Sequence, residues 1–208
     1  MSVTINYNKR PLKKNLSSPI LFCDEKFNIS SLKKHVIASE YSFITDLIKS
    51  KDTKKNILSF DINSKKKIIL ISFKKNTKKS DAENLGAKFY DLFKDSKQSE
   101  YYLNSDSVSF QLKNFIGYFL HGLKLKSYVF DKYKTKKDKK NLSISVIGKN
   151  KPKIIEQIKF KAVEEGTYYT RDLVSEPGNV LHPDEYAKRL IKLKKHGLKV
   201  TVYDQKKL

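Results

Sequence analysis

Several residue types are scarce in this chain of 208 residues, and each scarcity excludes a class of protein. A single cysteine rules out an internal disulfide framework. No apolar run approaches the roughly eighteen residues that a membrane span needs, so no membrane partner is expected. The first residues lack the apolar segment of a signal peptide, which favours a cytoplasmic location.

Residues that would carry chemistry are also few. The seven glycines are dispersed, so no Gly-rich phosphate loop is present. Cys23 lies in an apolar run without a neighbouring base, which favours a small buried residue over a nucleophile. No zinc-site spacing separates the four histidines, which are His35, His121, His182 and His196. The sequence therefore predicts no catalytic, metal-binding or cofactor-binding residue in this chain.

Positive charge dominates what is present. The 44 Lys and Arg residues outnumber the 22 Asp and Glu residues, which gives a formal net charge of +22. Only three of the basic residues are Arg, and Lys lacks the planar fork that usually grips base edges. Lysines spread over solvated surfaces are the simpler interpretation. Weak, salt-sensitive and non-specific binding of nucleic acid is the alternative.

Apolar periodicity predicts alternating strands and helices over roughly the first 150 residues. Strands are expected at 3–7, 19–23, 56–62, 67–73, 100–103 and 141–147. Helices are expected at 31–48, at 108–128, and from Ser80, where Glu83 would complete a capping box. This interleaving predicts an α/β fold, with a mixed sheet flanked by helices.

A long helix should follow this region. Pro152 is expected to begin it, with Ile155, Ile158 and Ala162 facing inward. Pro177-Gly178-Asn179 cannot continue a helix.

A second helix is expected from Pro183, a residue pre-set for the first helical position, to Lys195. His196-Gly197 should close it, and residues 198–202 alternate as a strand does. A helix and strand without further partners form an incomplete unit, which we interpret as the result of truncation.

Four carboxylates near the end of the long helix form the best candidate for a polar site. They are Glu164, Glu165, Asp172 and Glu176, of which the last two would share a helix face. Paired carboxylates can bind a metal or do acid–base work. The simpler interpretation is that Arg171 and Asp172 pin the helix end by ion pairs or caps.

Two segments, 115–137 and 170–190, carry more specific motifs. The first contains Gly122 and the sequence Tyr-Lys-Thr-Lys, and the second reads TRDLVSEPGNVLHPDEYAKRL. Together with the weaker run at 85–93, they resemble the leucyl aminopeptidase (cytosol aminopeptidase) family. The second segment is similar to the joint between the two domains of that family, although Ser175 and His182 depart from its more usual Asn and Thr.

The resemblance implies a macro-domain-like N-terminal domain over residues 1–150, a linker helix over 151–178, and the truncated beginning of a catalytic peptidase domain over 179–208. It implies a homohexameric parent that removes N-terminal residues from peptides with two divalent metals, zinc or manganese. In the family, the metal ligands and catalytic residues lie beyond the joint. This chain should therefore bind no cofactor and be inactive alone. Structural roles at the joint are expected for Arg171, Asp172, Pro177, Asn179 and Pro183.

Two other hypotheses are open at this point. The chain could be a nucleic-acid or nucleotide binding module, because macro-like domains can hold ADP-ribose and the charge would permit DNA binding. It could also be a non-catalytic regulatory or structural subunit that joins full-length hexamers. A salt titration of DNA binding tests the first, and the reading frame after codon 208 tests the second.

Overall fold

The structure is a computed structural model that describes residues 2–7, 18–50, 55–108, 113–136, 140–204 and 206–207. The chain divides into two compact units, Met1–Glu164 and Glu165–Leu208. The boundary falls inside one long helix, α4 (Ile154–Ser175), so each unit is described by itself.

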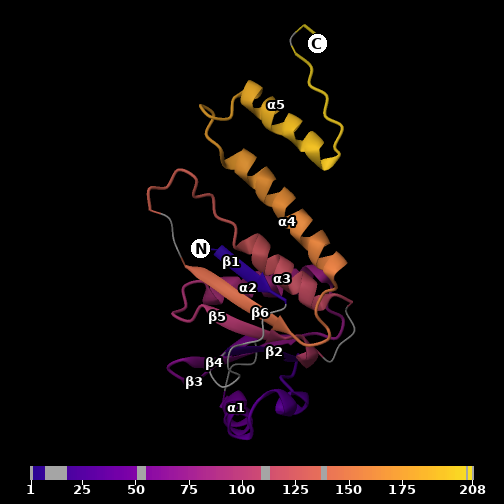
Figure 1. Ribbon diagram of the computed structural model, residues 1–208. Helices are drawn as coiled ribbons and strands as arrows, with labels where there is room; N and C mark the ends of the chain where they lie inside the picture. The colour runs from indigo at the N-terminus through magenta and orange to yellow at the C-terminus, as the bar shows by residue number, and fades with distance from the viewer. Residues whose placement is uncertain are drawn as a thin grey trace. The chain divides into compact units, whose positions relative to one another are not determined.

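The first unit is built on a six-stranded sheet in the order β1-β6-β5-β2-β4-β3 (Figure 1). All neighbouring strands pair in parallel except β3, which is antiparallel to β4. Parallel neighbours require crossover connections, and helices supply them here. The strands are β1 (Ser2–Asn6), β2 (Ser18–Asp24), β3 (Ile57–Asn63), β4 (Lys66–Phe73), β5 (Glu100–Asn104) and β6 (Asn141–Ile147).

Helices cover both faces of this sheet (Figure 1). On one face lie α2 (Lys79–Phe93) and α3 (Phe115–Lys126). On the other lie the 3-10 helix η1 (Ser30–His35) and α1 (Ala38–Ser50), and a short turn, η2 (Ser105–Ser107), follows β5. Because both faces are covered, β2 and β4 are nearly continuous buried runs. The predicted α/β fold, with a mixed sheet flanked by helices, is confirmed.

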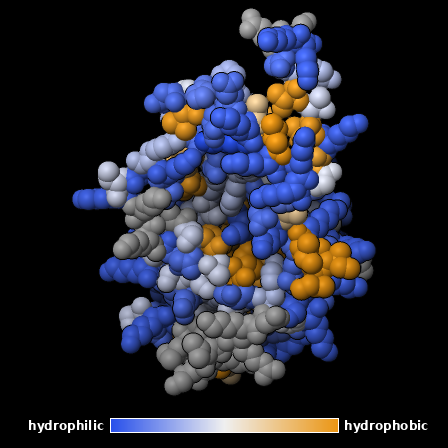
Figure 2. Space-filling model, turned by 45° about the horizontal axis from the view of Figure 1, so that its top comes forward, coloured by the Kyte–Doolittle hydropathy of each residue, from blue (hydrophilic) through white to orange (hydrophobic). Residues whose placement is uncertain are grey.

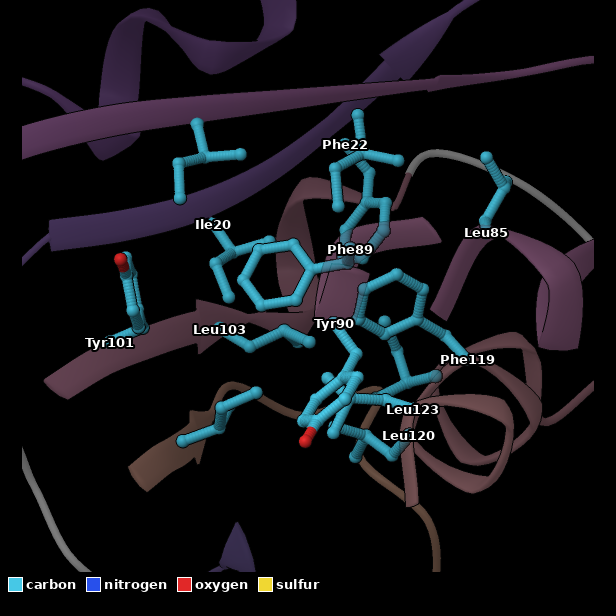
Figure 3. Close-up of a cluster of buried hydrophobic side chains, with 14 of the residues drawn as sticks. Ile20, Phe22, Leu85, Phe89, Tyr90, Tyr101, Leu103, Phe119, Leu120 and Leu123 are labelled. Atoms are coloured by element: carbon cyan, nitrogen blue, oxygen red, sulfur yellow. The ribbon is translucent and has the colours of Figure 1, made fainter. Parts of the chain in front are cut away.

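Aromatic rings fill the larger core, which lies between the sheet and the helices α2 and α3 (Figure 3). Phe22 and Phe119 meet edge to face at 5.4 Å between centroids, and Phe89 meets Phe119 at 5.9 Å. Such pairs add about 0.5–1.5 kcal/mol each beyond the burial of their area. The abundant Phe residues therefore supply the bulk that a chain without Trp would otherwise lack.

Two glycines bring α2 and α3 into backbone contact. A Cβ atom on Gly86 would lie 1.9 Å from the carbonyl oxygen of Phe119. A Cβ atom on Gly122 would lie 2.0 Å from the carbonyl oxygen of Glu83. No side chain fits at either position, so Gly122, which belongs to the first motif segment, has a packing role.

The predicted helix over 31–48 is interrupted. Ser30–His35 form η1, and the chain is extended at Val36 (φ −127°, ψ 161°) before α1 begins at Ala38. Both pieces bury apolar residues in the same smaller core. Two short elements therefore satisfy the apolar spacing that predicted one helix.

The start of α2 also differs from the prediction. The helix begins at Lys79, and Asp81 supplies the capping carboxylate, which accepts a hydrogen bond from the Lys78 amide at 2.9 Å. The predicted box of Ser80 and Glu83 is therefore wrong, because the N-cap residue is Lys78, two positions before Ser80.

The start of α3 lies later than predicted. The helix begins at Phe115 rather than Val108, because Asn114 has a positive φ of 65° that a right-handed helix excludes. Leu112, predicted on its apolar face, lies outside the described residues. Phe119 and Leu123 are fully buried on the predicted face.

The second unit contains the end of α4, then α5 (Pro183–Ile191) and the 3-10 helix η3 (Lys192–His196). Pro183 occupies the first turn of α5 as predicted, and Gly197, with a φ of 83°, closes η3. The strand predicted at 198–202 is wrong, because the described chain offers that segment no strand to pair with. No described helix is both long and apolar enough to cross a membrane.

Candidate functional site around the joint

The joint, residues 170–190, lies in the second unit, where α4 gives way to α5. Arg171 and Asp172 lie on the last turns of α4. Pro177 and Asn179 lie in the turn that follows, where the amides of residues 180 and 181 both donate to the Pro177 carbonyl oxygen at 2.9 Å. Pro183 then begins α5. Each of the five predicted joint residues thus lies at or beside a helix boundary.

An arginine that the sequence analysis missed organises this segment. Arg189 donates to Glu176 at 2.9 Å and to Glu185 at 3.0 Å. The Glu176 side chain is 1% exposed. The hydrogen bond with Glu176 raises the pKa of Arg189, and the bond from Arg189 lowers the pKa of the Glu185 carboxyl. The Tyr169 hydroxyl donates to the Arg189 carbonyl oxygen at 3.0 Å, so α5 is tied to α4 through Tyr169 and to the start of the turn through Glu176.

This arrangement corrects the grouping of the four carboxylates. Glu176 lies just beyond the end of α4, where its carboxylate pairs with Arg189 instead of sharing a site with Asp172. Glu164 pairs with His121. Among the residues that the structure describes, no group of three or more His, Cys, Asp or Glu side chains is placed to hold a metal ion. Glu164 and Glu176 therefore act in separate ion pairs.

In the first unit, the pair of His121 and Glu164 anchors the middle of α4. The His121 Nδ1 and Glu164 Oε1 atoms lie 3.1 Å apart, and both residues are buried. The Phe160 ring packs against His121 and Tyr118, each at 5.2 Å between centroids. A Cβ atom on Gly117 would lie 2.4 Å from the same ring. These contacts fix one side of α4 against α3.

The opposite side of α4 is apolar and open. Ile154, Ile155 and Ile158 are 67%, 76% and 62% exposed, and Ala162 is exposed too. The prediction that Ile155, Ile158 and Ala162 face inward is therefore wrong for this unit. Figure 2 shows exposed apolar residues of this chain as orange patches on a mostly blue surface. The helix turns its polar side, with Phe160, toward its own unit.

The remaining candidate groups are scattered. His35 lies 2.9 Å from the Asn104 amide nitrogen, His182 caps α5, and His196 ends η3. Burial and the nearby Asp24 raise the pKa of the Cys23 thiol to about 12, so the thiol stays protonated.

Comparison with known proteins connects these features to one family. No protein-family profile matches the chain. The "Probable cytosol aminopeptidase" of Phytoplasma mali (strain AT) is 36% identical over 109 residues, which are 51% of this chain and 22% of that protein. The protein of the same name from Bradyrhizobium sp. is 40% identical over 88 residues, which are 40% of this chain and 18% of that protein.

Solved structures share the fold. A mutant of tomato leucine aminopeptidase matches 100% of this chain and 45% of its own, with a TM-score of 0.72 and 16% identity. The cytosol aminopeptidase of Coxiella burnetii matches 93% of this chain and 37% of its own, with a TM-score of 0.62 and 16% identity. The chain thus spans less than half the length of these relatives. The motif segments, the sequence matches and the shared fold agree: over the part of the relatives that it covers, the chain is similar to the leucyl aminopeptidases (cytosol aminopeptidases).

Proposed function

We propose that this chain supplies the N-terminal portion of a longer, metal-dependent leucyl aminopeptidase. In this proposal, residues 1–150 form the macro-like N-terminal domain and 151–178 the linker helix, and 179–208 begin the peptidase domain. One observation carries it: the fold match covers all of this chain but only 45% of the tomato enzyme. The parent would remove N-terminal residues from peptides in the cytoplasm, as a homohexamer.

The orientation of α4 supports a role in joining two bodies. Apolar residues recur along it at helical spacing, from Ile155 and Ile158 through Ala162. In the first unit this row faces solvent. Covering an exposed Ile contributes about 1.5–3 kcal/mol, so a partner surface on this row would add several kcal/mol. Further polypeptide of the same enzyme is the partner that we propose.

Continuation of the same row past the unit boundary supports this role. Within the second unit, Leu173 on α4 is buried, and Tyr169 is held by the Arg189 carbonyl oxygen. In the second unit, the apolar row of α4 is therefore covered at Tyr169 and Leu173. We expect the remainder of a peptidase domain to extend that cover.

Two divalent ions supply the hydrolytic chemistry in this family by polarising the carbonyl and generating hydroxide. One related fold, the bottromycin maturation enzyme BotP, is described in complex with Mn, with 14% identity and a TM-score of 0.63 over 92% of this chain and 39% of that one. The described residues of this chain do not provide such a site, because they hold no group of three metal-ligating side chains. We therefore assign no hydrolytic step to them and propose that the chain is inactive alone.

The reading frame of the gene tests this proposal. We expect codons after Leu208 to continue into a peptidase domain, and the longer product to release leucine in a chelator-sensitive reaction. In that product, Ile158→Lys should lower the melting temperature, while Ile158→Met should leave it nearly unchanged. A stop codon directly after Leu208 would instead favour the regulatory-subunit hypothesis.

A further inference from the structure

The outer edge of the sheet at β3 has backbone groups that no described strand uses. β3 is the last strand of the sheet and pairs only with β4. The Ser72 amide of β4 donates to the Asn56 carbonyl oxygen at 2.8 Å, just before β3 begins. Because antiparallel pairing alternates along a strand, the amides and carbonyls of Ile57, Ser59 and Asp61 point away from β4. They form a row of free partners for another strand.

A groove of about 950 Å³ lies beside this edge, between β3 and the last turns of α2. Its apolar lining consists of Ile57, Leu92 and Phe93. Leu92 is 60% exposed, although the other large apolar residues of α2 are buried. An extended segment beside β3 could thus pair its backbone with the edge and place an apolar side chain against Leu92.

The carboxylates that line the groove are already neutralised, with one exception. Asp61 pairs with Lys67 at 2.7 Å. Asp91 pairs with Lys94 at 3.3 Å and with Lys126 at 3.1 Å. Desolvation, the largest single effect, raises the pKa of its carboxyl, but the two lysines together outweigh it and lower that pKa. Only Asp95 lines the groove without an ion pair in the described part of the chain.

Two lysines of the groove remain uncompensated. Lys55 and Lys88 both line it, and neither side chain makes an ion pair or hydrogen bond with the residues that the structure describes. Lys88 also borders an adjoining hollow of about 300 Å³, together with Lys74. The charge that the groove leaves unmatched is therefore positive, which complements acidic side chains.

We propose that the β3 edge and this groove bind an extended acidic peptide segment as an added strand. Main-chain bonds to Ile57, Ser59 and Asp61 supply the pairing. An apolar side chain lies against Leu92, and flanking carboxylates meet the free lysines. A second copy of this chain fits poorly, because two such edges would bring like charges together on molecules of net charge +22.

A short fluorescent peptide of alternating Glu and Val is the probe, with fluorescence anisotropy as the measurement. Ser59→Pro removes the outward amide without breaking a bond to β4, since proline is tolerated on edge strands. Ser59→Ala keeps that amide and is the matched control. We expect Ser59→Ala to bind within about twofold of wild type and Ser59→Pro at least about tenfold more weakly, a factor equal to 1.4 kcal/mol. The double change Lys55→Glu and Lys88→Glu should also weaken binding about tenfold.

Two further probes test the backbone pairing and the charge preference separately. If circular dichroism shows that Ser59→Pro does not fold, a probe with N-methylated backbone amides replaces it and should not bind the wild-type chain. A Lys–Val probe should bind far more weakly than the Glu–Val probe. Equal binding of the two probes, or unchanged binding after the proline and charge-reversal substitutions, would overturn the proposal. So would concentration-dependent dimerisation that Ser59→Pro abolishes, since the occupant would then be a second copy.

Discussion

Replacing Gly122 by alanine should destabilise the first unit, although alanine is the better helix former. The new Cβ atom would lie 2.0 Å from the Glu83 carbonyl oxygen, whereas ordinary contact begins at 3.4 Å. The backbones of α2 and α3 would have to separate by the difference, about 1.4 Å. Overpacking of this kind costs about 1–3 kcal/mol. A backbone obstacle cannot rotate away, so we expect the upper end of that range.

The helix propensity of alanine offsets part of this loss, by up to about 1 kcal/mol. The expected net loss is therefore about 2 kcal/mol in the free energy of unfolding. Gly166→Ala is the matched control, because a Cβ atom there meets nothing within 4 Å and the residue lies inside α4. That substitution should stabilise its helix by about 0.4–1 kcal/mol.

Urea denaturation followed by circular dichroism measures both substitutions. The two should shift the unfolding midpoint in opposite directions. If Gly122→Ala were as stable as the wild type, or if both changes stabilised the protein, the close approach of α2 and α3 would be refuted.

Three further predictions concern other parts of the chain. Cys23 should react with a thiol reagent about a thousandfold more slowly in the native protein than in urea, because only thiolates react and its pKa rises from 9.0 to about 12. Its folded pKa of about 12 lies above the unfolded value of 9.0, so its contribution to stability should be complete below pH 9 and lost as the pH rises toward 12. Cys23→Ala should remove that part of the alkaline loss. The Lys66 ammonium lies 2.5 Å from the buried Glu40 carboxylate. Lys66→Met should lower the free energy of unfolding by about 3–5 kcal/mol, because it leaves that carboxylate buried without its partner. The double change with Glu40→Leu should restore most of that loss, and equal effects of the single and double changes would contradict a buried pair. Duplex DNA should bind weakly, with a steep loss of affinity as salt rises and no sequence preference. A preferred sequence that persists at high salt would instead indicate a nucleic-acid binding module.

Strand positions could be predicted from the sequence because the strands are short and their apolar residues lie together. The run Ile68–Ile71 is buried on both faces, as its lack of alternation indicated. The helix boundaries were less accurate. Asn114 and Val36 interrupt helical patterns through their backbone conformations, which apolar spacing does not report.

Helix α4 shows a second limit of the sequence. Periodicity located the apolar row of Ile155, Ile158 and Ala162, but it could not tell on which side of the helix a partner lies. Phe160 and the pair of His121 and Glu164 hold α4 to the first unit on the other side of the helix. His121 and Glu164 are 43 residues apart in sequence, so periodicity along α4 does not report their contact.

At the joint, the sequence predicted the helix boundaries but not the ion pairs. Proline and glycine chemistry predicted where α4 ends and α5 begins, since these residues act locally. The role of Arg189 was missed, because its bond to Glu176 depends on the path of the turn. Two signals could have indicated it: the scarcity of arginine, and the spacing of Glu185 and Arg189, four residues apart on one helix.

Hydrolysis of a leucine chromogenic substrate by the purified chain 1–208 tests the central claim most directly. The assay should contain zinc or manganese, with a chelator in a parallel reaction and the tomato enzyme as a positive control. We predict no metal-dependent release of the chromophore above the protein-free rate. Release that requires the metal and stops with the chelator would show that this chain holds its own hydrolytic centre, and would contradict the account.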